Sequence, residues 1–296
     1  MPTIQLYSSP ANPNAWHRVR APGGYEWWRF DAYDAQHDRH LAIIFYEGFV
    51  FDPVFQQRYA QYCRHPTRYP PPLPSEFPCV HFAMHERGEL RAQFTTPRIA
   101  NQFHESNEST AITIGDNRVE TADDGSHIAL RGPSLAAKLI FRPLFQHPPL
   151  LRAIHAEHYW IIADPLCEVA GTIEFAGETI EFRGRGFRDH QFGLSPPVSR
   201  SVHGYVLLED SACAFHIAPS LIFVEADAAG LRETRIACME FDWQSALPRI
   251  IDFDGVLSIS NPRLLEIAPA RARYDAVWRG RSGEAICGIG SHDSGR

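Results

Sequence analysis

The sequence predicts an all-β protein made of two tandem antiparallel β-barrels. Three observations lead to this fold class: short segments rich in aromatic and β-branched residues recur along the 296-residue chain, polar turns separate them, and no apolar repeat of helical period stands out. The chain also lacks the strand-then-helix alternation that is typical of parallel sheets. The length accommodates two domains of ordinary size, and we place them at residues 1–148 and 149–296.

The first half begins with an aromatic hairpin, which follows a polar segment ending in a turn. Residues 25–33 and 40–46 are rich in strand formers, and the polar residues between them indicate a turn. Residues 47–79 differ, because their prolines exclude a central strand and only residues 55–62 suit a helical turn or two. We interpret residues 47–79 as an insertion. Further strands are predicted at residues 80–85, 90–94, 111–119, 127–132 and 135–141.

Pro143, Pro148 and Pro149 interrupt this pattern and mark the predicted domain boundary. The second half repeats the short strands and frequent turns of the first. Its strands are predicted at residues 158–163, 167–175, 178–183, 203–208, 212–217, 220–226, 235–243, 256–259 and 264–277.

Charge and cysteine usage exclude several classes of protein. The net charge is −7 and the sequence has no run of Lys and Arg, so duplex nucleic acid is not expected as a partner. The six cysteines show no CxxC spacing, which indicates reduced thiols without a disulfide framework or a zinc site. We see no secretory signal and no apolar stretch long enough to cross a bilayer. We therefore expect a cytoplasmic protein, and leave peripheral contact with a membrane open.

The segment at residues 183–193 concentrates more polar chemistry than any other. Between Gly186 and Gly193 it carries five different functional groups, on Arg188, Asp189, His190, Gln191 and Phe192. On a regular strand Asp189 and His190 would face opposite sides, but a bend at the glycines would relax that restriction. His190 could then give or take a proton near neutral pH, with its charge set by a carboxylate from elsewhere in the chain or by Asp189. Alternatively, Arg188 and Asp189 pair and fix a corner of a barrel.

The aromatic hairpin supplies a second candidate group. Strand alternation places Glu26, Trp28 and Phe30 on one face, and Tyr25, Trp27, Arg29 and Asp31 on the other. If Glu26 faces inward, loss of solvation raises its pKa and makes it a usable general acid. The alternative is a solvent-facing Glu26 beside structural tryptophans.

Several further residues are candidates for lining an apolar interior. His158 and Trp160 share a face of their predicted strand, and a metal site at His155 and His158 is not expected, since no third ligand stands at a suitable spacing. His203 and His216, with Phe215 beside the latter, lie on strands that follow the central motif. The sequence has no nucleophile elbow, phosphate loop or dinucleotide fingerprint, so we expect no cofactor. The remaining chemistry is acid/base catalysis in an aromatic-lined hollow, which suits apolar substrates.

Two segments resemble the carotenoid 1,2-hydratase (hydroxyneurosporene synthase) family and its AttH-like, lipocalin-like relatives. The first is Gly23-Gly24-Tyr25-Glu26-Trp27-Trp28-Arg29-Phe30-Asp31-Ala32, which is similar to that family's Gly-Gly-Tyr-Glu-Trp-Trp-Tyr-Phe-Asp-Ala opening. The second is Gly184-Arg185-Gly186-Phe187-Arg188-Asp189-His190-Gln191-Phe192-Gly193, which is similar to its Gly-x-Gly-Tyr-x-Asp-His-Asn-Trp-Gly centre.

This resemblance implies two tandem lipocalin-like barrels and an enzyme that adds water to a terminal isoprenoid double bond without a redox cofactor. An acid protonates the alkene, aromatic faces stabilise the carbocation, and water captures it. His190 and Asp189 take the acid/base positions and Phe192 the aromatic one. The chain departs from the family at Gln191-Phe192, where Asn-Trp is usual, at Arg29, where Tyr is usual, and at residues 213–217, which offer neither the Tyr nor the Asp of the hydratases.

We therefore predict a hydratase-like enzyme whose catalytic residues are His190, Asp189 and Glu26, with no metal. The substrate is expected to be an apolar isoprenoid or lipid. The alternatives are a non-catalytic carrier of an apolar lipid or terpenoid and a lipocalin-like pericyclic cyclase. The residues predicted to contact the substrate are Trp27, Trp28, Phe30, His158, Trp160, Arg188, Gln191, Phe192, His203, Phe215 and His216.

Overall fold

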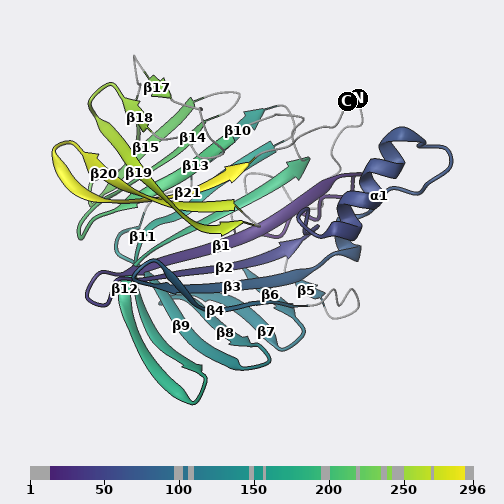
Figure 1. Cartoon of the computed structure of the whole chain (residues 1–296), viewed down its shortest axis with the longest axis horizontal. Helices are drawn as coiled ribbons and strands as arrows, with labels where there is room; N and C mark the ends of the chain where they lie inside the picture. Colours follow the sequence, from purple (N-terminus) through teal and green to yellow (C-terminus); the bar gives the residue numbers. More distant parts are fainter. Residues whose placement is uncertain are drawn as a thin grey trace. The chain divides into compact units, whose positions relative to one another are not determined.

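Strands dominate the computed structural model, as predicted (Figure 1). No helix in the described part of the chain is long and apolar enough to cross a membrane. The structure describes residues 14–96, 103–105, 110–146, 150–155, 158–194, 201–217, 221–234, 239–241, 250–267 and 270–290.

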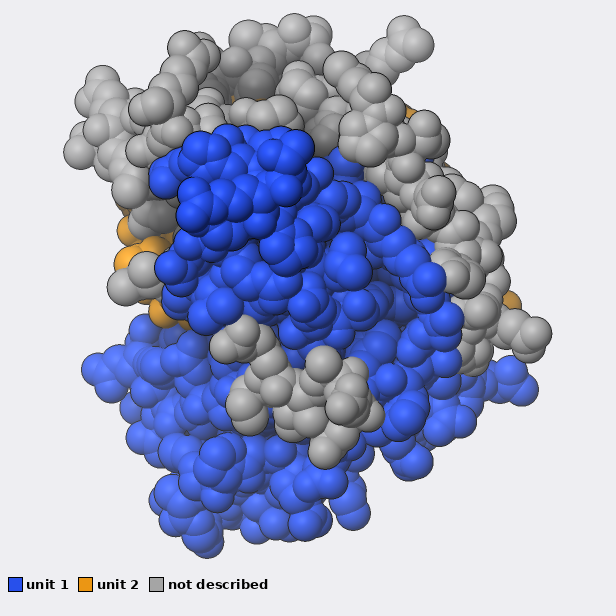
Figure 2. Space-filling view, turned by 90° about the vertical axis from the view of Figure 1, so that its right-hand side faces the viewer, with its two compact units in different colours: residues 1–143, 148–196 blue, residues 144–147, 197–296 orange. Residues whose placement is uncertain are grey.

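The chain divides into two compact units, coloured separately in Figure 2. The first unit comprises residues 1–143 and 148–196, and the second comprises residues 144–147 and 197–296. This division differs from the predicted boundary between residues 148 and 149. The cause is strand pairing: β11 (His158–Phe175) pairs with β9 (Leu135–Pro143), and β12 (Glu178–Leu194) pairs with β1 (Gly24–Asp34). Both long strands therefore complete the sheet of the first unit.

The first unit is built on a sheet of twelve strands. Along its main path the strands follow the order β4-β3-β2-β1-β12-β11-β9-β8-β7-β6-β5, and β10 also pairs with β11. The remaining elements of this unit are β2 (Arg39–Glu47), α1 (Pro53–Arg64), η1 (Pro74–Glu76), β3 (Cys79–Glu86), β4 (Glu89–Thr95), β5 (Phe103–Glu105), β6 (Ala111–Ile114), β7 (Asn117–Ala122), β8 (Gly125–Arg131) and β10 (Leu150–His155).

One face of this curled sheet encloses a hydrophobic core. Alternate residues along the strands supply it, as expected for a sheet with one buried face. Trp28 and Phe30 of β1, Phe45 of β2 and Phe182 of β12 are among its fully buried members. We call this side of the sheet the core face, and the other side the opposite face.

The central motif is not at a bend, contrary to one of our interpretations. β12 runs continuously through it and pairs with β1 from Gly24↔Leu194 to Tyr33↔Arg185. Its glycines instead permit close strand packing: a Cβ on Gly184 would lie 2.2 Å from the carbonyl oxygen of Tyr33. The motif and the aromatic hairpin are thus neighbours in one sheet, 164 residues apart at Glu26 and His190.

The insertion forms a short helix with its own apolar contacts. Asp52 caps α1 by accepting the backbone N–H groups of Val54 and Phe55. Phe55 is buried and packs against Phe77, at 5.1 Å between ring centroids. The helical turns predicted at residues 55–62 are therefore confirmed.

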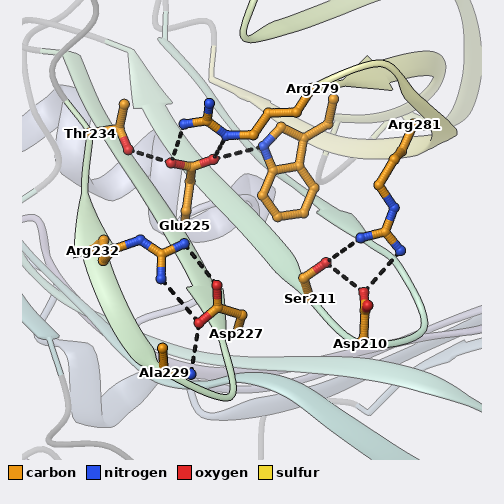
Figure 3. Close-up of polar contacts among 10 residues, drawn as sticks. Asp210, Ser211, Glu225, Asp227, Ala229, Arg232, Thr234, Arg279 and Arg281 are labelled. Atoms are coloured by element: carbon orange, nitrogen blue, oxygen red, sulfur yellow. Dashed lines mark hydrogen bonds and ion pairs between the residues drawn. The ribbon is translucent and has the colours of Figure 1, made fainter.

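The second unit is a nine-stranded antiparallel sheet with a separate core. Its order is β16-β15-β14-β13-β21-β20-β19-β18-β17. Ion pairs join its strands and turns (Figure 3): Glu225 accepts from Arg279 and Trp278, and Asp227 pairs with Arg232. The strands are β13 (Ser201–Leu207), β14 (Ala212–Ile217), β15 (Leu221–Asp227), β16 (Gly230–Glu233), β17 (Met239–Phe241), β18 (Ile250–Phe253), β19 (Leu257–Ile267), β20 (Ala270–Trp278) and β21 (Arg281–Gly290).

Candidate functional site

Asp189 and His190 lie on opposite faces of the first sheet. His190 is directly opposite Trp28 on the core face, whereas Asp189 is opposite Arg29 on the opposite face. Each residue belongs to a different buried polar cluster. The core-face cluster contains Trp16, His17, Glu26, Glu47 and His190, and the opposite-face cluster contains Arg29, Trp160, Asp189 and Gln191.

Glu26 is the centre of the core-face cluster and is fully buried. Its Oε1 accepts a hydrogen bond from His190 Nε2 at 2.9 Å, from His17 Nδ1 at 3.1 Å and from the His17 backbone N–H at 2.5 Å. Its Oε2 accepts the backbone N–H of Arg18 at 2.7 Å. Of the two orientations that the sequence left open for Glu26, the structure has the inward-facing one.

Aromatic rings fix both imidazoles beside Glu26. The His190 ring stacks on Trp28, with centroids 4.1 Å apart and an angle of 20° between planes. The His17 ring stacks on Phe192 at 3.9 Å and 15°. Phe192 therefore takes an aromatic position in this cluster, as the family resemblance implies.

The electrostatics of Glu26 differ from our expectation. Burial opposes its ionisation, but hydrogen bonds from His17 and His190, and the attraction of their rings, outweigh burial and lower its pKa. Our expectation of a raised pKa considered burial alone. A lowered pKa favours the ionised form of Glu26, in which the carboxylate attracts protons or cationic groups.

Glu47 is a residue of this cluster that our sequence analysis missed. It lies directly opposite Glu26 in the β1–β2 hairpin, and Trp16 Nε1 donates to its Oε2 at 2.5 Å. Burial raises the pKa of Glu47 to about 8; the Trp16 hydrogen bond opposes this, and the charge of Glu26 adds to it. The hairpin register could have identified Glu47, because Asp34 faces Arg39 across the turn and counting back places Glu26 opposite Glu47.

The opposite-face cluster is an ion pair supported by neutral donors. Arg29 binds Asp189 through two hydrogen bonds of 3.0 and 2.7 Å. Trp160 Nε1 and Gln191 Nε2 donate to Asp189 Oδ2 at 2.8 and 3.1 Å. Burial raises the pKa of Asp189, and Arg29, Gln191 and Trp160 oppose that shift. Arg29, which replaces the usual Tyr of the family, therefore has a partner in the central motif.

Arg188 does not pair with Asp189, contrary to our alternative interpretation. It lies on the core face, where Nε is 2.5 Å from Asp164 Oδ2 and the guanidinium is 5.0 Å from the centre of the Trp28 ring. Its Nη1 donates to Thr121 and Ser126, and its Nη2 donates to Asn14. Strand alternation separates Arg188 from Asp189 just as it separates Asp189 from His190.

The predicted substrate-contacting residues fall into three groups instead of one. Trp28, Phe30, Arg188 and Phe192 lie on the core face, where Phe30 is fully buried in the core. Trp27, His158, Trp160 and Gln191 lie on the opposite face, where burial lowers the pKa of His158 to about 3. His203, Phe215 and His216 belong to the second unit; the two histidine rings stack at 5.8 Å across β13 and β14.

The donor atoms of His17, Glu26 and His190 lie within 4.8 Å of one another, which is close enough to share a metal ion. Two histidines and a glutamate are a ligand set that zinc accepts. However, both oxygens of Glu26 already accept backbone N–H groups, and Oε1 also accepts from both imidazoles. We therefore interpret the group as a hydrogen-bond cluster.

Comparisons with known proteins place this geometry in context. No protein-family model matches the sequence. The chain is 27% identical over 201 residues to a hydroxyneurosporene dehydrogenase of Chlorobaculum tepidum. That match covers 62% of this chain and 52% of the relative, so it spans about half the length of the relative. The resemblance to proteins of this name is thereby confirmed.

Solved structures show the same architecture. A protein described as AttH from Nitrosomonas europaea superposes with a TM-score of 0.60 at 15% identity, covering 90% of this chain and 92% of that one. CghA superposes with a TM-score of 0.59 at 9% identity, covering 100% and 98%. The chain has the fold of these proteins. It is an all-β, lipocalin-like fold with two curled antiparallel sheets.

Proposed function

We propose that the protein is a hydratase-like enzyme that adds water to a carbon–carbon double bond of an isoprenoid. Glu26 and His190 stand at the centre of this acid/base chemistry. The observation that carries the proposal is their contact: the two residues come from the two segments that resemble the hydratase family, are fully buried, and are joined by a 2.9 Å hydrogen bond.

The arrangement suits proton transfer. An imidazole whose Nε2 faces a buried carboxylate can accept a proton from water, because the carboxylate stabilises the imidazolium that forms. Trp28, which stacks on His190 and lies 5.0 Å from the Arg188 guanidinium, contributes an aromatic ring beside the proposed acid/base pair. The opposite-face Asp189 takes a different role in this proposal: it positions His190 by fixing β12 against Arg29 of β1.

The substrate class follows from the named relative. Hydroxyneurosporene, which appears in its name, is a hydroxylated isoprenoid, and hydration of an alkene is a reaction that produces such an alcohol. The same name also denotes a dehydrogenase. The sequence contains no dinucleotide-binding fingerprint, and we therefore favour hydration over a dehydrogenase reaction for this chain.

The test is to incubate the purified protein with acyclic carotenoids in detergent micelles and to analyse the extract by mass spectrometry. Hydration gives a product heavier by one water molecule. A product lighter by one hydrogen molecule would indicate a dehydrogenase, and retention of unchanged carotenoid would indicate a carrier; either result contradicts the proposal.

His190→Ala tests the assigned residue. We expect its hydration rate to fall by about 10²–10⁴-fold, the usual contribution of a general acid or base. The matched control is His127→Ala on β8, an exposed histidine paired with Asp124, which should keep wild-type activity. Equal activity in both variants would show that the reaction does not use His190.

A further inference from the structure

We propose that Glu47 is the general acid of the core-face cluster, donating a proton to the alkene carbon while the Glu26–His190 pair accepts a proton from water. This inference rests on the proposed function and adds a catalytic residue that neither the central motif nor the aromatic opening segment contains.

The first argument is geometric. Glu47 ends β2 directly opposite Glu26, so both side chains project from the core face at adjacent positions. Side chains directly opposite in an antiparallel pair have Cβ atoms roughly 5 Å apart. Two carboxyl groups at this spacing can serve one reacting molecule with two different functions, as acid/base pairs in enzymes do.

The second argument concerns which carboxyl holds the proton. Two adjacent buried carboxylates cannot both keep their charge without a large cost. Glu26 accepts four N–H groups, including two from imidazoles that can carry positive charge. Glu47 accepts one neutral indole N–H from Trp16. The negative charge therefore belongs on Glu26 and the proton on Glu47, and burial raises the pKa of Glu47 to about 8, in agreement.

Other charged groups face Glu47 as well. Glu105 of β5 adds negative charge and so favours the protonated form, whereas Arg18 opposes it. Arg18 itself forms an ion pair with Glu105, which reduces the influence of both on Glu47. Burial and the negative charges of Glu26 and Glu105 thus all favour the protonated form of Glu47.

The third argument is accessibility. Glu26 and His190 are 0% exposed, while Glu47 retains 6% exposure. Trp16 binds Oε2, and among the described residues Oε1 has no hydrogen-bond partner. A protonated Glu47 can therefore accept the indole N–H on its carbonyl oxygen and present its O–H to another molecule. Trp16 contacts both Glu47 and His190, because its Nε1 donates to Glu47 and its ring stacks on the His190 ring with centroids 6.1 Å apart.

The proposed step balances without an oxidant or a reductant. The π electrons of the alkene take the proton of Glu47, which forms a C–H bond and leaves a carbocation and the Glu47 carboxylate. A lone pair of water forms the C–O bond, and the proton that water loses passes to the Glu26–His190 pair. Transfer of one proton from that pair to Glu47, directly or through solvent, restores the starting state.

The experiment compares Glu47→Gln, Glu47→Asp and the control Glu181→Gln, an exposed position on β12. Activity is measured with the acyclic carotenoid that the wild type hydrates. We expect Glu47→Gln to lose about 10²–10⁴-fold in rate, Glu47→Asp to recover part of that loss, and Glu181→Gln to match wild type. The wild-type rate should fall as the pH rises above about 8, because Glu47 loses its proton.

A second readout does not depend on activity. In protein labelled with ¹³C at the glutamate carboxyl carbons, NMR should show one carboxyl that titrates well above neutral pH in wild type and in Glu181→Gln, and that is missing in Glu47→Gln. Absence of such a carboxyl in the wild type overturns the inference, even if Glu47→Gln fails to fold. Wild-type activity in Glu47→Gln would also overturn the inference. A titrating carboxyl in a wild type that hydrates no carotenoid would instead remove the proposed function, and the acid role with it.

Discussion

The two faces of the β1–β12 strand pair each bury a carboxylate, but they surround it with different partners. Asp189 is held by the guanidinium of Arg29, a cation that does not lose its proton in proteins. Glu26 is held by two imidazoles and two backbone N–H groups. A fixed cation makes the first pair a rigid crosslink, whereas imidazoles can exchange protons near neutral pH. This difference is the basis on which we propose a structural role for the opposite-face cluster and proton chemistry for the core-face cluster.

The largest expected effect is the loss of stability when the buried Arg29–Asp189 ion pair of the opposite-face cluster is broken. Arg29→Leu leaves Asp189 buried without its cation, and removing one partner of a buried ion pair costs about 3–5 kcal/mol. Unfolding by urea should show this loss of stability. The double variant Arg29→Leu/Asp189→Leu should recover only part of it, because the buried charge of Asp189 is gone but Asp31, which lies 3.6 Å from Arg29 Nε and is fully buried, still loses its cation. If the single variant were as stable as wild type, the ion pair would not be a structural crosslink.

Within the core-face cluster, Glu26 and Glu47 are expected to change the stability of the protein with pH in different ways. The pKa of Glu26 is lowered in the folded protein, so its contribution is present above the unfolded pKa of about 4.3 and is lost as the pH falls through the folded pKa. The pKa of Glu47 is raised to about 8, so its contribution is lost as the pH rises from about 4.3 through 8. The two glutamates therefore act on stability in opposite directions.

Urea unfolding at a series of pH values measures these slopes. One such group changes the free energy of unfolding by at most about 1.4 kcal/mol per pH unit. Glu47→Gln should remove its share of the decline above about pH 5, while Glu181→Gln should keep the wild-type curve. Identical curves for Glu47→Gln and wild type would mean that Glu47 is ionised in the folded protein.

The smallest effect is expected at an exposed ion pair of the second unit. Arg232 and Asp227 form two hydrogen bonds of 3.0 and 2.8 Å, but Arg232 is 51% exposed. Arg232→Leu should therefore cost less than about 1 kcal/mol, as exposed pairs do. The same urea measurement as for Arg29→Leu checks this. A loss as large as that of Arg29→Leu would show that burial does not explain the difference between the two pairs.

The fold class and the faces of β1 could be predicted from the sequence. Alternation alone placed Glu26 and Trp28 on one side and Arg29 on the other, because a strand has a period of two residues. The domain boundary could not be predicted in the same way. Prolines near residue 148 mark an interruption of strands, but they carry no information on the pairing of β11 and β12 with strands far away in the chain.

The candidate site was only partly predictable for a similar reason. Glu26 and His190 were identifiable because each lies in a conspicuous motif, yet their contact depends on a register between segments 164 residues apart. His17 lies in a polar segment without strand pattern, so nothing in the sequence indicated that its backbone would bind Glu26. The lowered pKa of Glu26 depends on this contact, which is why burial alone predicted the wrong direction.

The distance along the chain between β1 and β12 has a consequence for synthesis. The ribosome adds about 5–20 residues per second, so the 164 residues between Glu26 and His190 take roughly 8–33 s to make. During that time β1 can pair with β2, but the backbone N–H and C=O groups along its other edge have no partner strand. Unpaired strand edges invite association between nascent chains. Slow translation or a shortage of chaperones should therefore lower the yield of this protein more than that of a β protein whose strands pair only with neighbours in sequence.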